Sequence, residues 1–266
     1  YSSFQFNGSP MTLAYINQRM RNEPINEVVQ IKGQSMSHPI LNSNDEFADF
    51  ELSQFTFSTT LPPPSRPNGS YVREAYQNGL KFGKDLGANP FKFGLIGSSD
   101  GHNSAGATDE DNYFGKFVSR DGTAERRLNT EDRFLSNRFM SAAGLAGVWA
   151  ESNTREAIYS ALERKETFAT SGSRILARLF AGENINVDFD DENWLKSAYA
   201  QGVPMGGDLE KPETPPDFVI WAIKDANGAN LDRVQMIKTW IDDARETPGA
   251  QRTAQRHPRR CTCQNE

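Results

Sequence analysis

The residues best suited to chemistry lie in one short segment, Gly97-Ser98-Ser99-Asp100-Gly101-His102-Asn103. It places a carboxylate and an imidazole two positions apart, and in an extended chain such side chains point to the same side. Gly101 between them allows the backbone to bend without a side-chain clash. Aspartate and histidine together are ligands for Zn²⁺, Mn²⁺ or Fe. Asp100 and His102 are therefore candidate metal ligands.

The spacing alone leaves a second interpretation open. Asp-x-His is a weak pattern, and Asp100 could cap the backbone of a turn while His102 faces solvent. Taken by itself, the spacing favours that turn. The segment does follow an apolar, strand-type run, however, and barrel enzymes place such ligands at the carboxyl ends of their strands.

Helix-type and strand-type patterns alternate up to about residue 170 and must position this segment. Ser70 is expected to cap one helix and Gly87 to end it. Asn153 is expected to cap another helix, with Glu156 completing a capping box. The predicted elements are a helix at 11–21, a strand at 25–31, a helix at 71–86, a strand at 91–97, a strand at 144–150 and a helix at 154–165.

The pattern predicts two domains and a tail. Residues 1–170 form the first domain, and the polar stretch at about 103–141 is too long for an ordinary connection, so we expect a functional insertion or partial disorder there. Residues 58–70 are rich in proline and resemble a linker. Short β-type runs separated by turn residues make 171–242 a β-rich, sandwich-like domain. The basic tail at 243–266 has no periodicity, and we expect it to be disordered or aberrant.

Composition excludes several classes of protein. Hydrophobic residues make up 36% and charged residues 24%, as in ordinary globular proteins. The net charge of −6 argues against a nucleic-acid partner. No apolar run approaches the roughly 20 residues that cross a bilayer. Both cysteines, Cys261 and Cys263, lie in the tail, so no disulfide framework or thiol nucleophile is expected in the body.

Several longer stretches resemble domain-of-unknown-function family 3604, which is related to the polymerase and histidinol phosphatase (PHP) superfamily of metal-dependent hydrolases. The resemblance runs from about residue 8 to about residue 240. It implies an α/β fold with a partial, distorted (β/α) PHP-type barrel followed by a small β-sandwich-like domain. The stretches are NEVVQIKGQSMSHP, NDEFADFE, NPFKFGLIGSSDGHN, DEDNYFGK, GVWAESNTREAI and RKETFATSGSRI.

The resemblance also implies a metal site with two or three divalent ions (Zn, Mn or Fe) and hydrolysis by a metal-activated water. GSSDGH matches the late Asp-x-His metal motif of the superfamily, which makes Asp100 and His102 ligands. Glu27 matches a glutamate that bridges two metals, although strand pattern alone does not fix its face, and a solvent-facing carboxylate remains open. His38, before Pro39, is a candidate ligand, a substrate contact or a surface histidine.

Four further residues are candidate substrate contacts. Lys32 and Gln34 follow the strand of Glu27, where a cation could hold an anionic substrate oxygen. Asn103 ends the Asp-x-His segment, and Arg73 begins a helix. A surface lysine or a structural ion pair explains such residues about as well. The expected substrate is a small anionic molecule or ester.

The early His-x-His motif of the superfamily has no counterpart here, because the histidines are His38, His102 and His257. We therefore expect a C-terminal fragment with an incomplete metal shell and little activity of its own. The resemblance leaves a periplasmic or secreted setting open, and nothing indicates an oligomeric state.

Two other functions stay open at this point. An amidohydrolase-like enzyme would use the same ligands to cut C–N or C–O bonds. A non-catalytic protein would instead bind a glycan or a partner, with Trp194, Trp221 and Trp240 as an aromatic platform, although such residues are more often core.

Overall fold

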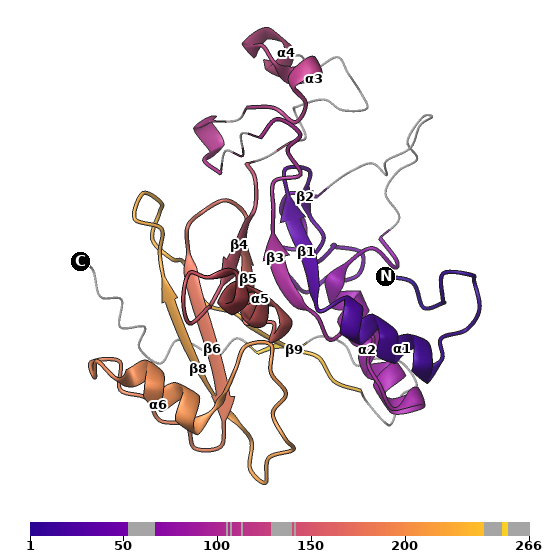
Figure 1. The fold of residues 1–266 in the computed structure, drawn as a ribbon, viewed down its shortest axis with the longest axis vertical. Coiled ribbons are helices and arrows are strands. Elements are labelled where there is room, and N and C mark those ends of the chain that lie inside the picture. The colour runs from indigo at the N-terminus through magenta and orange to yellow at the C-terminus, as the bar shows by residue number, and fades with distance from the viewer. Residues whose placement is uncertain are drawn as a thin grey trace.

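The computed structural model describes residues 1–52, 67–104, 106, 108–112, 114–128, 140, 142–241 and 252–254. Within these residues the fold is mixed α/β, with short strands arranged in four small sheets (Figure 1). Over these ranges the strands do not close into a barrel. None of the helices in the described ranges has the length and apolar character that a membrane crossing requires.

The first sheet contains a parallel pair of strands, β1 (Ile25–Gln30) and β3 (Gly94–Gly97). The short strand β2 (Gly33–Gln34) pairs antiparallel with β1 on its other edge. Both predicted strands are therefore present, the second one shorter than expected. Because β1 and β3 are parallel, their carboxyl ends lie at the same edge of the sheet.

The helices α1 (Leu13–Asn22) and α2 (Val72–Leu86) confirm the two helices predicted in this half. Gly87 ends α2 in the left-handed conformation, as expected. The cap predicted at Ser70 is wrong, because Tyr71 occupies the cap position and makes no side-chain cap bond. The first N–H groups of α2 instead donate to the backbone carbonyls of Ser35 and Met36, at 2.8 and 3.1 Å.

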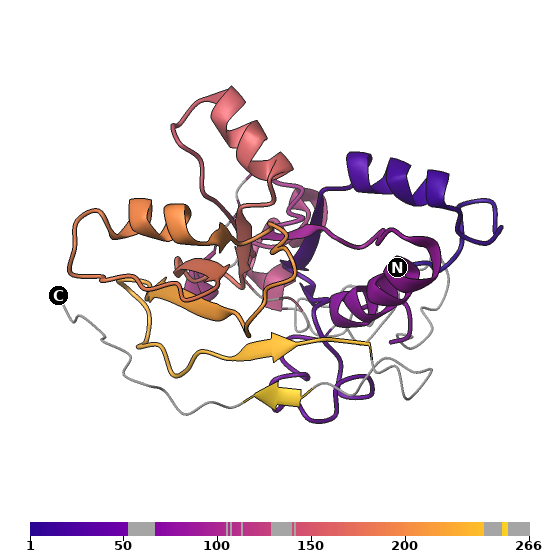
Figure 2. The ribbon, with the colours of Figure 1, turned by 90° about the horizontal axis from the view of Figure 1, so that it is seen from below.

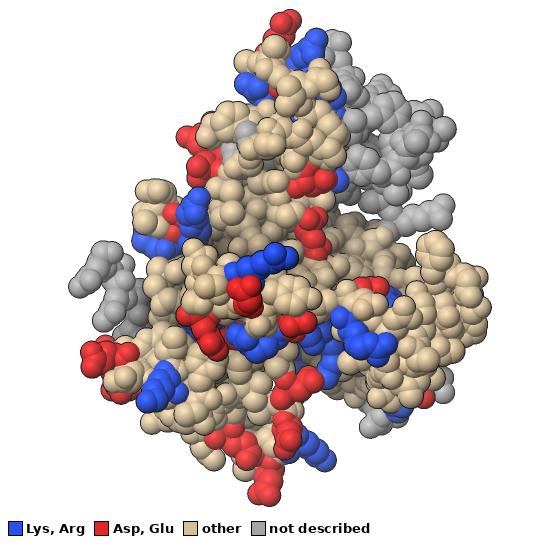
Figure 3. Space-filling model, in the orientation of Figure 1, with Lys and Arg blue, Asp and Glu red and all other residues tan. Residues whose placement is uncertain are grey.

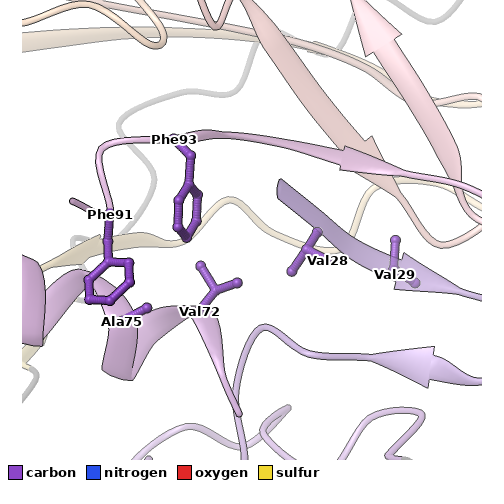
Figure 4. Packing of buried hydrophobic residues seen from close by; sticks show 6 residues of the cluster. All are labelled: Val28, Val29, Val72, Ala75, Phe91 and Phe93. Carbon is purple, nitrogen blue, oxygen red and sulfur yellow. The ribbon is translucent and has the colours of Figure 1, made fainter. Parts of the chain in front are cut away.

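The apolar face of α2 packs against β1 and the residues before β3 (Figure 4). Val72 and Phe91 are fully buried there, and the ring of Tyr1 stacks on that of Phe93 at 5.8 Å. This core holds β1 and β3 in place. Its buried members are Val28, Val29, Val72, Ala75, Phe91 and Phe93.

A second, antiparallel pair, β4 (Leu145–Val148) and β5 (Thr167–Thr170), lies beside β3 (Figure 1). The helix α5 (Arg155–Glu163) joins the two strands. The cap predicted at Asn153 is wrong, since Thr154 caps α5 by accepting from the Ala157 N–H at 3.3 Å. That shift places alanine at the third helical position, so the capping box predicted with Glu156 does not form.

The β-rich half contains the sheet β7-β6-β8, in which all pairs are antiparallel. An unpredicted helix, α6 (Trp194–Gln201), covers one face of this sheet through a cluster that includes Phe180 and Ala198 (Figure 2). Trp194 and Trp221 are half-buried, with ring centroids 5.5 Å apart. The strands are β6 (Leu176–Gly182), β7 (Val203–Pro204) and β8 (Asp217–Ile223), while β9 (Met236–Lys238) pairs with β10 (Arg252–Ala254).

The predicted insertion contains three short helical segments where it is described: η1 (Glu110–Asn112), α3 (Val118–Asp121) and α4 (Ala124–Leu128). Figure 1 shows α3 and α4 projecting beyond the carboxyl ends of β1 and β3. Most of the predicted linker, and the predicted tail apart from β10, fall outside the described residues, as do Cys261, Cys263 and His257.

Candidate functional site

The Asp-x-His segment leaves the end of β3 through a turn. Asp100 has a φ of 51°, in the left-handed region that aspartate tolerates better than most residues. The extended geometry expected for residues 100–102 is therefore wrong. The two side chains nevertheless converge, because the turn brings Oδ1 of Asp100 to 3.3 Å from Nε2 of His102.

Parallel pairing brings a lysine to the same place. The Ser98 N–H donates to the Val29 carbonyl at 2.9 Å, which continues the pairing of β3 with β1 past the end of β3. Lys32 lies two residues after the end of β1, and its ammonium donates to Oδ2 of Asp100. Lys32 thus reaches the segment because both strands end at one edge of the sheet.

A second lysine, Lys116 from the insertion, donates to the same Oδ2 atom. Its side chain is only 3% exposed, against 22% for Lys32 and 26% for Asp100. Two ammonium groups thus face one carboxylate. Lys32 was predicted from the sequence as a substrate contact, whereas Lys116 was not predicted. Lys116 ends the stretch DEDNYFGK, which is one of those that resemble the family.

These contacts set the charge of the carboxylate. Burial raises the pKa of Asp100, but the hydrogen bonds and charges of Lys116 and Lys32 outweigh burial and bring that pKa down to about 2. Burial lowers the pKa of Lys116, and the hydrogen bond to Asp100 opposes that fall. Asp100 is therefore ionised at any pH near neutrality.

A buried carboxylate, Asp121, holds the insertion around Lys116. Its side chain is 1% exposed and accepts the backbone N–H groups of Lys116 and Phe117 at 2.8 and 2.9 Å. Arg120 Nε also donates to it, at 2.6 Å. Gly115 allows the close approach, because a Cβ at that position would lie 2.3 Å from the Cβ of Asp121.

The insertion is also joined to the Asp-x-His segment directly. The His102 N–H donates to the Lys116 carbonyl at 2.8 Å, and the Asn103 side-chain amide donates to the Gly115 carbonyl at 2.9 Å. The rings of His102 and Phe117 lie 4.5 Å apart. Asn103 was predicted to contact the substrate. In this structure its side chain helps to hold the insertion against the Asp-x-His segment.

Glu27 does not lie with the Asp100–His102 pair. It stands opposite Ile96 in the sheet and accepts hydrogen bonds from the Ser98 hydroxyl and, at 3.0 Å, from Gln30 Nε2. Ser98 connects it to the turn that carries Asp100. Across the described part of the chain, no three His, Cys, Asp or Glu side chains gather where one metal ion could bind all of them.

The other predicted site residues make local contacts. His38 Nδ1 accepts the Ile40 N–H at 3.1 Å, and the guanidinium of Arg73 pairs with the buried carboxylate of Asp45. The Gln34 side chain accepts the Ser37 N–H at 3.0 Å and stabilises the turn after β2. Their roles in ligand or substrate binding stay predictions.

Oδ1 of Asp100 and Nε2 of His102 are in hydrogen-bonding contact in this structure, and both are donor types that bind divalent metal ions. Two ligands of one tetrahedral zinc ion, at ordinary Zn–N and Zn–O lengths, lie about 3.3 to 3.5 Å apart. The separation between Oδ1 and Nε2 is 3.3 Å, and the lysines occupy the other oxygen, Oδ2. His102 is half exposed, so its ring is accessible.

Comparison with known proteins agrees with the sequence reasoning on the family. No curated protein and no solved structure matches the chain. A family model described as "Protein of unknown function (DUF3604)" matches residues 1–250, a range that contains β1, β3, the insertion and every residue of the site described above. The chain therefore belongs to the DUF3604 family of proteins of unknown function.

Proposed function

We propose that this protein is a metal-dependent hydrolase of anionic esters, of the phosphoesterase type. The observation that carries the proposal is the 3.3 Å separation of Asp100 Oδ1 and His102 Nε2, at the carboxyl end of a strand in a parallel pair. In the proposed site these two atoms hold a divalent ion (Zn, Mn or Fe). Such an ion supplies a water activated near neutral pH and stabilises developing negative charge.

The two oxygens of Asp100 have different partners. Oδ2 accepts from both lysines, which keeps the carboxylate ionised and fixes its orientation. Oδ1 faces the imidazole and is the oxygen offered to the ion. The low pKa of about 2 means that no proton has to leave Asp100 before an ion binds.

The lysines hold the substrate. Lys32 and Lys116 place two positive charges beside the proposed metal ligands, and preorganised cations of this kind stabilise an oxyanion. Because Lys116 is almost fully covered, its charge is screened little by water. An anionic ester is thus the substrate class that this charge distribution favours.

We extend the proposal to the fold and to the remaining ligands. In this proposal the parallel strands β1 and β3, which are followed by Lys32 and Asp100, belong to a distorted PHP-type barrel as neighbouring strands. Catalytic zinc sites have three protein ligands, so further groups complete the proposed site, which holds two or three ions. Glu27 is a candidate, because it contacts the Asp100 turn through Ser98.

Metal content tests the proposal. The purified protein should retain zinc or manganese, measured by plasma mass spectrometry, and should hydrolyse p-nitrophenyl phosphate. Asp100→Asn and His102→Ala should each lose both properties. Asp208→Asn is the matched control, because Asp208 is an exposed carboxylate that pairs with Lys92.

Unchanged metal content in Asp100→Asn would refute the ligand assignment. A panel of phosphoesters, amides and lactones then identifies the bond that is cut. Turnover of amides or lactones without turnover of phosphoesters would assign the protein to amidohydrolase-like chemistry instead.

A further inference from the structure

Strand β8 lies at the edge of the sheet β7-β6-β8. It pairs with β6 over its whole length, from Asp217 opposite Gly182 to Ile223 opposite Leu176. Over the part of the chain that the structure describes, β6 is the one strand that pairs with β8, and Figure 1 shows β8 on the outer side of β6. The other side of an edge strand presents backbone N–H and C=O groups with which a further strand can pair.

The sequence of β8 does not protect this edge. Natural edge strands are usually kept from pairing by short length, by a lysine or proline, or by a bulge. β8 has seven residues, and the stretch from Phe218 to Ile223 contains neither a charged residue nor proline. Its seven pairs with β6 follow one another without interruption. A long and regular edge of this kind favours association with another strand.

Large apolar side chains along β8 are exposed. Phe218 is 50% exposed, Ile220 is 36% exposed and Ile223 is 46% exposed. Leu176, which faces Ile223 from β6, is 39% exposed. Figure 3 shows a largely uncharged area between α6 and the loop that follows β8. Apolar surface that is grouped in this way is typical of a protein–protein interface.

The sequence of β8 is complementary to itself. Two copies can pair antiparallel about Ile220, the middle residue of the strand, which then faces Ile220 of the second copy. In that register Phe218 faces Ala222 of the second copy. Val219 faces Trp221 of the second copy in the same way. Such pairs of apolar, aromatic and β-branched side chains stabilise neighbouring strands.

The charge of β8 also permits this pairing. Asp217 is the charged residue of the strand, and in the same register it faces Ile223 of the second copy. The two carboxylates therefore lie at opposite ends of the paired strands, and the destabilising case of like charges that face each other does not arise. A second copy of the chain is thus an occupant that this edge fits in both shape and charge.

We infer that two copies of this chain associate through β8 and form a symmetric dimer, which joins their three-stranded sheets into one. A two-fold axis at Ile220 uses both β8 edges at once, so the assembly closes at two copies. The inference goes beyond the proposed hydrolase function and does not depend on a metal ion.

Sedimentation velocity of the full chain at micromolar concentrations tests the inference. The unaltered protein should sediment with twice the mass of one chain. Ile220→Lys should raise the dissociation constant of the dimer about tenfold or more, because the two lysines would face each other at the axis. Leu13→Lys is the matched control, since Leu13 is a 48% exposed aliphatic residue on α1, and it should leave the dimer intact.

A cysteine variant tests the register and does not depend on the loss of a dimer. Residues that face each other in an antiparallel pair have Cα atoms about 4.5 to 5.5 Å apart, which is within the range of a disulfide. In a chain with Cys261→Ser and Cys263→Ser, Ile220→Cys should give a disulfide-linked dimer on a non-reducing gel. Leu13→Cys in the same background should stay monomeric on that gel.

Three outcomes would overturn the inference. An unaltered protein that sediments as a monomer would mean that another segment of the chain, a different protein or solvent covers the edge of β8. A dimer that Ile220→Lys leaves intact would place the interface elsewhere. Equal cross-linking of Ile220→Cys and Leu13→Cys would show random collision in place of a specific register.

Discussion

At the scale of the residue, the arrangement around Asp100 depends on the charge of a second, distant carboxylate. The Lys116 ammonium donates to Asp100, and Asp121 fixes the backbone around Lys116 by accepting the N–H groups of Lys116 and Phe117. Asp121 acts on the backbone of Lys116 and is not itself a proposed metal ligand. Its contribution can therefore be measured through folding alone.

Asp121 predicts a specific pH dependence of stability. Burial raises its pKa, but the hydrogen bonds from Arg120 and from the backbone of Phe117 and Lys116 outweigh burial and lower that pKa to about 2. A carboxylate with a depressed folded-state pKa stabilises fully above its unfolded value of 3.8, and this stabilisation is lost as the pH falls from 3.8 toward 2. At pH 7 it should amount to about 2 kcal/mol.

Urea unfolding of the protein and of Asp121→Asn at pH 7, 4, 3 and 2.5 measures this effect. The variant should be less stable by about 2 kcal/mol at pH 7, and the difference should shrink below pH 4. A difference that stays constant down to pH 2.5 would show that the ionised carboxylate contributes nothing to folding.

Residue type and the family stretch selected Asp100 and His102, and the structure brings their side chains together, while their role as metal ligands stays a prediction. The left-handed turn at Asp100 could not be predicted, because it depends on how the insertion returns to the segment through His102 and Lys116. Lys116 was missed for the same reason, since it follows Asp100 by 16 residues and its ammonium reaches the site only in the folded chain.

At the scale of the element, the close approach of β3 to the β4–β5 pair depends on glycine at position 97, which has no side chain. A Cβ at Gly97 would lie 2.7 Å from the carbonyl oxygen of Leu145 and 2.9 Å from that of Thr170. Both contacts are with backbone, which cannot rotate out of the way as a side chain can. The strand that carries the Asp-x-His segment is thus held by backbone packing.

Gly97→Ala should therefore displace β3 and destabilise the fold by about 1 to 3 kcal/mol, as overpacking does. Gly83→Ala is the matched control, because a Cβ at Gly83, within α2, meets only Asn89 Cβ, at the ordinary distance of 4.0 Å. Alanine there should stabilise α2 by about 1 kcal/mol. Urea unfolding compares the two, and equal effects would contradict the packing argument.

The elements were predicted better than their ends. Apolar periodicity identified β1, β3, α2 and α5, because burial of one face governs both period and packing. The cap predicted for α2 was wrong because carbonyl groups from another part of the chain, those of Ser35 and Met36, accept the first N–H groups of this helix. The helix α6 was missed, although Gly202 follows it at the position typical of a helix end.

At the scale of the whole molecule, Trp149 is among the residues that connect the mixed half (residues 1–170) to the β-rich half (residues 171–241). Trp149 follows β4, and its indole N–H donates to the Ala177 carbonyl on β6 at 2.9 Å. The guanidinium of Arg178 lies 3.6 Å from the centre of the Trp149 ring, and the ring of Trp221 on β8 lies 6.2 Å away. Sequence patterns placed a boundary near residue 171 but could not reveal this contact, because it joins segments that are far apart in the chain.

Removal of this contact should uncouple the two halves. The intact protein should unfold in a single step in urea, with coincident transitions by far-ultraviolet circular dichroism and tryptophan fluorescence. Trp149→Ala should lose about 3 kcal/mol and separate the two transitions, because the β6–β8 sheet then loses an indole hydrogen bond, a cation–π contact and ring packing. Tyr159→Ala, an aromatic truncation at a position 61% exposed on α5, should leave the transition single and nearly unshifted. Coincident transitions in Trp149→Ala would mean that the halves are joined mainly through other contacts, such as the hydrogen bond between Tyr199 and Glu166.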